Sequence, residues 1–171
     1  MSIPLKRPLL SITLLLGIAA QAQASTGTIT VTGRVLPGTC TLANLPIALA
    51  DIDATALKTG HDNGLRSAVL NFTGCVGVTS IDLSFDGTDD TAQDGHWKNG
   101  ATTGAASGVA VALLDGTTGS VFLKKGATKT IAVNGAATAR LNVRAGYYRK
   151  AGTLLTAGTV SSQITVTAAY K

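Results

Sequence analysis

Two stretches near the ends of the chain alternate apolar with polar residues, and they decide its fold. One reads Gly27-Thr28-Ile29-Thr30-Val31-Thr32-Gly33-Arg34-Val35, and the other reads Gly158-Thr159-Val160-Ser161-Ser162-Gln163-Ile164-Thr165-Val166-Thr167-Ala168-Ala169-Tyr170-Lys171. Successive side chains of a strand point to opposite faces, so this period of two predicts half-buried strands. Terminal segments usually fray. Strand sequence at both ends therefore indicates a pairing partner, which can belong to another chain.

The first residues have the pattern of an export signal. Lys6 and Arg7 precede an apolar run from Leu9 to Ala20, and Ala22-Gln23-Ala24 is a small-x-small cleavage site. We expect cleavage after Ala24, with residues 1–24 as the signal peptide. The apolar run is short for a membrane span, and an uncleaved anchor is the alternative.

The composition favours an all-β domain with a core of small side chains. The chain has no Glu, which favours helices, and is rich in Val and Thr, which favour strands. Many short strands between turns predict a sandwich or barrel. The segment 86–106 is expected to be a polar surface excursion. The candidate strands are Ile29–Val35, Thr41–Leu49, Arg66–Cys75, Ile81–Phe85, Gly108–Leu114, Ser120–Leu123, Thr128–Val133, Ala139–Ala145 and the segment after Gly158.

Two cysteines, Cys40 and Cys75, remain in a chain that is expected to be exported. An even count in an oxidising compartment predicts one disulfide. It would close a loop of about 35 residues, which stabilises the fold by about 3–4 kcal/mol in the chain-entropy model.

Few residues could carry chemistry. The only histidines are His61 and His96, and Asp62 lies beside His61 in sequence, which does not establish a catalytic geometry. We therefore expect no catalytic residue, no metal site and no cofactor. The four Asp residues between 86 and 94 do not match a calcium loop. Trp97 could stack on a sugar, but we expect it to anchor its loop.

The net charge is +5, but the basic residues are spread along the chain without interleaved aromatic residues. No nucleic-acid partner is therefore expected.

The ends and the cysteines together resemble the pilin subunits of bacterial chaperone–usher fimbriae, in particular the type 1-like major subunits. The stretch 27–35 followed by Cys40-Thr41-Leu42 is similar to the donor-strand extension and first cysteine of that family. The ending, with Gly158 fourteenth from the end and Tyr170 penultimate, is similar to its β-zipper signature. Two inner segments also carry the resemblance: Leu70-Asn71-Phe72-Thr73-Gly74-Cys75 and Ala106-Ser107-Gly108-Val109-Ala110-Val111-Ala112-Leu113-Leu114-Asp115.

The resemblance implies an incomplete immunoglobulin-like sandwich of about six strands at residues 36–171, preceded by an N-terminal donor strand at residues 25–35. The donor side chains would be Ile29, Val31, Gly33 and Val35. The strand that borders the groove and docks the chaperone would include Gly158, Val160, Ile164, Val166 and Tyr170. The implied partners are neighbouring pilin subunits, a periplasmic chaperone and an outer-membrane usher. The implied location is the cell surface, in a fimbria reached through the periplasm.

We interpret the chain as a structural subunit that polymerises by donor-strand exchange, most simply a shaft subunit supporting cell adhesion. One alternative is a minor adaptor or a one-domain adhesive subunit that uses Trp97 and the acidic loop as its contact surface. Another is that Ile29–Val35 is the first strand of a complete intramolecular sandwich. An exported enzyme is disfavoured by the scarcity of His and the lack of Glu.

Overall fold

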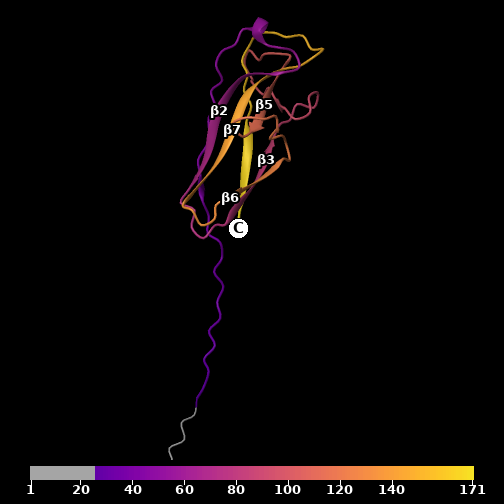
Figure 1. Cartoon of the computed structure of the whole chain (residues 1–171). Coiled ribbons are helices and arrows are strands. Elements are labelled where there is room, and N and C mark those ends of the chain that lie inside the picture. The colour runs from indigo at the N-terminus through magenta and orange to yellow at the C-terminus, as the bar shows by residue number, and fades with distance from the viewer. Residues whose placement is uncertain (1–25) are drawn as a thin grey trace, which may run out of the picture. The chain divides into compact units, whose positions relative to one another are not determined.

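The computed structural model describes residues 26–171, so the expected signal peptide, residues 1–24, lies outside the described residues. From Val35 onward the chain builds two antiparallel sheets (Figure 1). The all-β prediction is confirmed. The helical content of the described part is a single 3-10 turn, η1 (Ala54–Ala56), and no described helix is long enough to cross a membrane.

The larger sheet has the strand order β1-β2-β7-β5-β4, and the smaller has the order β6-β3-β8. Six of the eight strands are five residues or longer, which agrees with the expected number. Their bounds are β1 (Thr41–Leu42), β2 (Asp62–Thr73), β3 (Ser80–Gly87), β4 (Trp97–Lys98), β5 (Val109–Asp115), β6 (Thr128–Ala132), β7 (Thr138–Arg149) and β8 (Ile164–Tyr170).

The core follows the alternation of the strand sequences. Ile81, Leu83 and Phe85 of β3 are all buried, as their spacing predicts. In β7 the buried Leu141 and Val143 alternate with exposed polar residues. Such inward faces on both sheets form the core of a sandwich.

A disulfide joins Cys40, just before β1, to Cys75, just after β2, as predicted. The hydroxyl of Tyr170, the last residue of β8, donates a hydrogen bond to the carbonyl of Cys40 at 2.8 Å. The disulfide end of the larger sheet is therefore tied directly to the end of the smaller one.

The expectation of a polar surface excursion at 86–106 was wrong in its centre. Trp97 lies in β4, pairs with β5 and exposes none of its surface. Its ring N–H donates to the carbonyl of Leu123 at 3.0 Å. Lys98, which follows Trp97, is exposed, while the indole itself fills the core and His96 before it is also buried.

The acidic residues of this segment form ion pairs with lysines and do not converge on one another as metal ligands would. Asp94 contacts Lys124 at 3.1 Å, and the largely buried Asp90 contacts Lys150 at 2.8 Å. The loop is therefore held by ion pairs to distant parts of the chain.

The expected strand Ser120–Leu123 is reduced to a single bridge between Phe122 and Leu114. Its backbone still bonds to β5, because the amide of Leu123 donates to the carbonyl of Leu113 at 2.8 Å. A turn at Lys125–Gly126 then leads the chain away from β5, so the pairing between residues 120–123 and β5 stays short.

We expect Trp97→Ala to lower the free energy of unfolding by about 3–5 kcal/mol, because it empties a fully buried site and orphans the carbonyl of Leu123. Chemical denaturation of the full chain measures this. Val121→Ala is the matched control, since Val121 is 66% exposed and lies two residues before Leu123. A loss below about 1 kcal/mol for Trp97→Ala would contradict the anchoring role.

Candidate functional site: an open groove between the sheets

Strand β8 has a pairing partner on one side only. Its residues pair with β3 from Ile164 opposite Gly87 to Tyr170 opposite Ile81. Within residues 26–171, no strand pairs with its other edge. That edge presents a row of backbone N–H and C=O groups that are free to pair with an added strand.

The opposite side of the opening is formed by the segment 43–52. Here the predicted strand Thr41–Leu49 was wrong after Leu42, because only Thr41–Leu42 is a strand. The apolar residues Leu45, Ile47 and Leu49 are still half-buried and alternate with exposed residues. The segment thus has the side-chain pattern of a strand without a ladder. Pro46, which has no N–H to donate, suits such an edge position.

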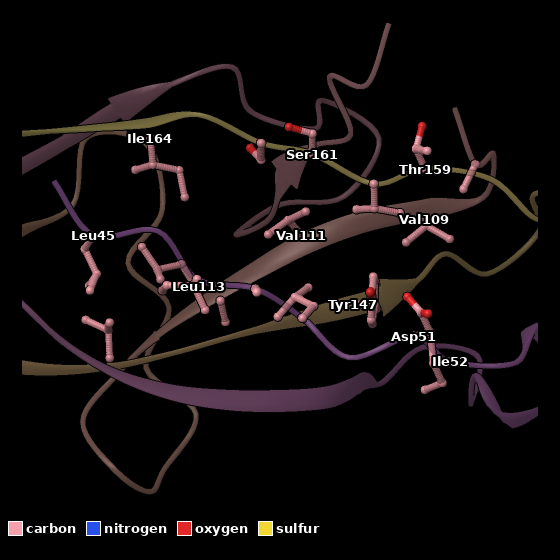
Figure 2. A pocket seen from close by; sticks show the side chains of 18 of the residues that line it. Leu45, Asp51, Ile52, Val109, Val111, Leu113, Tyr147, Thr159, Ser161 and Ile164 are labelled. Atoms are coloured by element: carbon pink, nitrogen blue, oxygen red, sulfur yellow. The ribbon is translucent and has the colours of Figure 1, made fainter. Parts of the chain in front are cut away.

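An elongated groove of about 970 Å³ lies between the segment 43–52 and the segment 155–166, which ends in β8 (Figure 2). We call it the acceptor groove. Its floor is apolar and comes from four strands. The floor residues are Leu70 of β2, Phe85 of β3, Val109, Val111 and Leu113 of β5, and Val143 and Ala145 of β7.

The two walls run in opposite directions along the acceptor groove. Figure 2 shows Leu45 across from Ile164 at one end, and Asp51 and Ile52 near Thr159 at the other. An added strand that is antiparallel to β8 would therefore run parallel to the segment 43–52.

The end of the groove near Asp51 is its polar end. The hydroxyl of Tyr147 donates to the carbonyl of Ala50 at 3.1 Å. Burial raises the pKa of Tyr147 above its ordinary value of 10.0, and the nearby carboxylate of Asp51 raises it further. The carboxylate of Asp51 therefore places a negative charge at this end of the groove, above its apolar floor.

Four of the five residues expected on the groove strand line the acceptor groove: Gly158, Val160, Ile164 and Val166. Tyr170 does not line it and instead bonds to Cys40. A side chain at Gly158 would meet the carbonyl oxygen of Gly104, since an added Cβ would lie 2.3 Å from it.

The regular strand begins at Ile164 rather than directly after Gly158. The side chain of Asn99 explains the difference, because it forms hydrogen bonds with the backbone of residues that precede Ile164. Its amide donates to the carbonyl of Thr159 at 3.0 Å, and its oxygen accepts from the amide of Ser161 at 3.0 Å.

The expected donor residues lie in a segment that forms no regular strand. Within it Ile29, Val31 and Val35 are at least 90% exposed. No added Cβ at Gly33 would meet another atom. The strands of the two described sheets all lie after Cys40.

Sequence reasoning missed the wall residues Leu45, Ile47 and Leu49 and the whole floor of the groove. The wall could have been found, because its period of two around a proline indicates an edge. The floor residues could not have been found in this way. A core side chain that lies under the open groove has the same sequence pattern as a core side chain that is covered by a strand.

Asp62 contacts His96 rather than its sequence neighbour His61. Nε2 of the buried His96 lies 3.2 Å from Asp62, and its Nδ1 lies 3.1 Å from the carbonyl of Asp94. The ring also contacts Phe122 and Tyr148. Both ring nitrogens of His96 therefore lie against oxygen atoms of the chain itself.

The chain matches known fimbrial proteins along most of its length. The family model described as Fimbrial protein matches residues 29–171. The S-fimbrial adhesin protein SfaS of Escherichia coli O6:K15:H31 (strain 536 / UPEC) is 33% identical over 169 residues, which cover 97% of this chain and 98% of that protein. Protein FimG of Escherichia coli (strain K12) is 31% identical over 159 residues, which cover 89% of each.

Solved structures share the fold. A chaperone–usher pilus structure has a TM-score of 0.62 at 15% identity and covers 90% of this chain and 100% of that one. The P pilus rod subunit PapA has a TM-score of 0.60 at 13% identity, and the match covers 78% of this chain and 100% of that one. The immunoglobulin-like pilin fold is thereby confirmed.

The chain belongs to the fimbrial protein family and is a fimbrial subunit of the chaperone–usher type, as the resemblance predicted. Membership of this family implies a place in a cell-surface pilus. The matched family and these two relatives are fimbrial proteins rather than enzymes.

Asp51→Asn should lower the pKa of Tyr147 toward its ordinary value of 10.0 without reaching it, because burial is the larger cause and remains. The raised pKa means that stability declines as the pH rises from 10.0 through the raised value, since the unfolded chain loses its proton first. Ultraviolet titration of the phenols measures the pKa, and Tyr147→Phe identifies the signal. An unchanged titration in Asp51→Asn would contradict the proximity of the two groups.

Proposed function

We propose that this chain is a shaft subunit that polymerises by donor-strand exchange. Residues 25–35 of one copy would occupy the acceptor groove of the next, adding the strand that β8 lacks. The observation that supports this is the groove itself, which has an apolar floor and is bordered by an unpaired strand edge and by a wall without a ladder. Strand addition of this kind uses main-chain bonds for affinity and alternate side chains for specificity.

The donor would run antiparallel to β8. Every strand ladder in the two sheets is antiparallel, and such pairing is slightly more stable per residue than parallel pairing. Ile29–Val35 and the wall Leu45–Asp51 each contain seven residues and span about 20 Å when extended. The donor therefore has the length of the wall beside it.

The donor side chains have the chemistry that the floor requires. Ile29, Val31 and Val35 lie on one face of an extended strand, together with Gly33. Burying each of the three large side chains contributes about 1.5–3 kcal/mol relative to leaving it exposed. Thr30, Thr32 and Arg34 would face solvent.

Donor and groove lie on different parts of the subunit, so each copy can engage two neighbours. Such head-to-tail contacts do not close and give a filament. Before assembly a periplasmic chaperone would cover the edge of β8, docking along Gly158–Tyr170, and an outer-membrane usher would receive the subunit. Cleavage after Ala24 would free the donor segment during export.

The second candidate function is a minor adaptor or one-domain adhesive subunit. It is favoured by the relative that is named a fimbrial adhesin and matches nearly the whole chain. The contact surface of such a subunit would not include the ring of Trp97, because that ring is fully buried.

The proposal is tested by thermal unfolding of a variant that lacks residues 25–35, with and without a synthetic peptide of those residues. We expect the peptide to raise the melting temperature markedly, because it fills the groove. A peptide with Ile29, Val31 and Val35 changed to Ser should raise the melting temperature little. A peptide with only Thr30 and Thr32 changed to Ser should raise it as much as the unaltered peptide does. A high melting temperature that no peptide changes would overturn donor-strand exchange.

Gly33→Leu should block polymerisation, because Gly33 is on the inward face of the donor and a large side chain there would collide with the groove. Size-exclusion chromatography of the full chain measures the polymer. Thr32→Leu adds the same side chain on the outward face and should polymerise normally. Normal polymers from Gly33→Leu would count against the assigned face of the donor.

A further inference from the structure

The residues on either side of Val35 are suited to a contact outside the acceptor groove. This inference rests on the proposed function. With Val35 directed inward, Arg34 and Leu36 are directed outward by the alternation of a strand. Leu36 is 65% exposed, and no ion pair among residues 26–171 involves Arg34. Both side chains are therefore available to another copy.

The direction of the donor determines where these two residues emerge. A donor antiparallel to β8 enters with Ile29 near Leu45 and leaves with Val35 near Asp51, the polar end of the groove (Figure 2). Adjacent Cα atoms are only 3.8 Å apart, so Arg34 and Leu36 must also lie at that end.

The rim of the acceptor groove at this end carries complementary groups. Asp51 lines the groove, is exposed, and takes part in no ion pair within the described residues. Just before the other wall, Leu154 is 81% exposed, while Leu155 and the residues after it line the groove. The carbonyl of Leu154 accepts a hydrogen bond from the hydroxyl of Ser107 at 2.9 Å, which holds it beside β5.

We propose that Asp51 and Leu154 form a docking surface at the groove mouth for a second copy of this chain. Arg34 of the incoming copy pairs with Asp51, and its Leu36 covers Leu154. The opposite charges steer the encounter and favour one donor direction, since a reversed donor would carry Arg34 away from Asp51. The apolar contact removes two large exposed side chains from water, which is favourable.

The test is a charge exchange in the full chain, followed by light scattering as subunits polymerise. Arg34→Asp alone and Asp51→Arg alone should each slow polymerisation about tenfold, a typical scale for lost electrostatic steering. The double variant should return to within about threefold of the unaltered rate. Arg140→Asp is the matched control, because Arg140 is exposed on β7 and does not line the groove. A double variant as slow as the slower single variant would overturn the pairing.

The apolar contact is tested by Leu154→Lys, which should slow polymerisation severalfold, with Val121→Lys as a control of similar exposure. Equal rates for these two variants would overturn that contact. Ile29→Ser with Val31→Ser separates this inference from the proposed function. If that variant polymerises normally, donor-strand exchange itself fails. If it does not polymerise while the mouth variants behave like the unaltered chain, the docking surface alone is wrong.

Discussion

The one-sided pairing of β8 is the constraint on which the rest of the structure depends. A sandwich core is sealed only when both sheets cover it along their full width, and here one strand position is left open. Residues on both sides of the opening, such as Leu45 and Ile164, therefore stay half-buried although their sequence suits a core. The chain satisfies its own core everywhere except along this line, so a strand from elsewhere has a defined place to bind.

The two walls of the opening are held by different interactions. The β8 wall has a full ladder to β3, and its end is fixed by bonds from Tyr170 to Cys40 and from Lys171 to Asp82. The contacts of Asp82 with Lys171, and secondarily with Thr130, keep the pKa of that carboxyl below its ordinary value. The other wall has no ladder and relies on the disulfide at its start and Tyr147 at its end. One wall is thus held by backbone pairing along β8, whereas the other is held without a ladder.

Much of this fold could be predicted from the sequence, because alternation reports the inward face directly. The burial of Ile81, Leu83 and Phe85 followed from their alternation, and the disulfide followed from the even number of cysteines in a chain expected to be exported. What could not be predicted depends on contacts between distant segments. Trp97 is buried because Leu123 offers it a carbonyl, and Asp62 pairs with His96, which lies 34 residues away. The strand ends at Leu42 because the following residues have no neighbouring strand to pair with. Sequence periodicity shows which side chains face inward, but it does not show whether a neighbouring strand is present.

The acceptor groove is lined only by residues from 42 onward, whereas the donor lies before them. The ability to donate a strand and the ability to accept one therefore depend on different residues of the chain and can be changed separately. In a filament assembled this way, a copy without residues 25–35 could bind a free donor in its own groove but would have no donor for the groove of another copy. It would act as a chain terminator at substoichiometric amounts. The mean length of the filament would then follow the ratio of intact to shortened copies, as in a polymerisation with a monofunctional monomer.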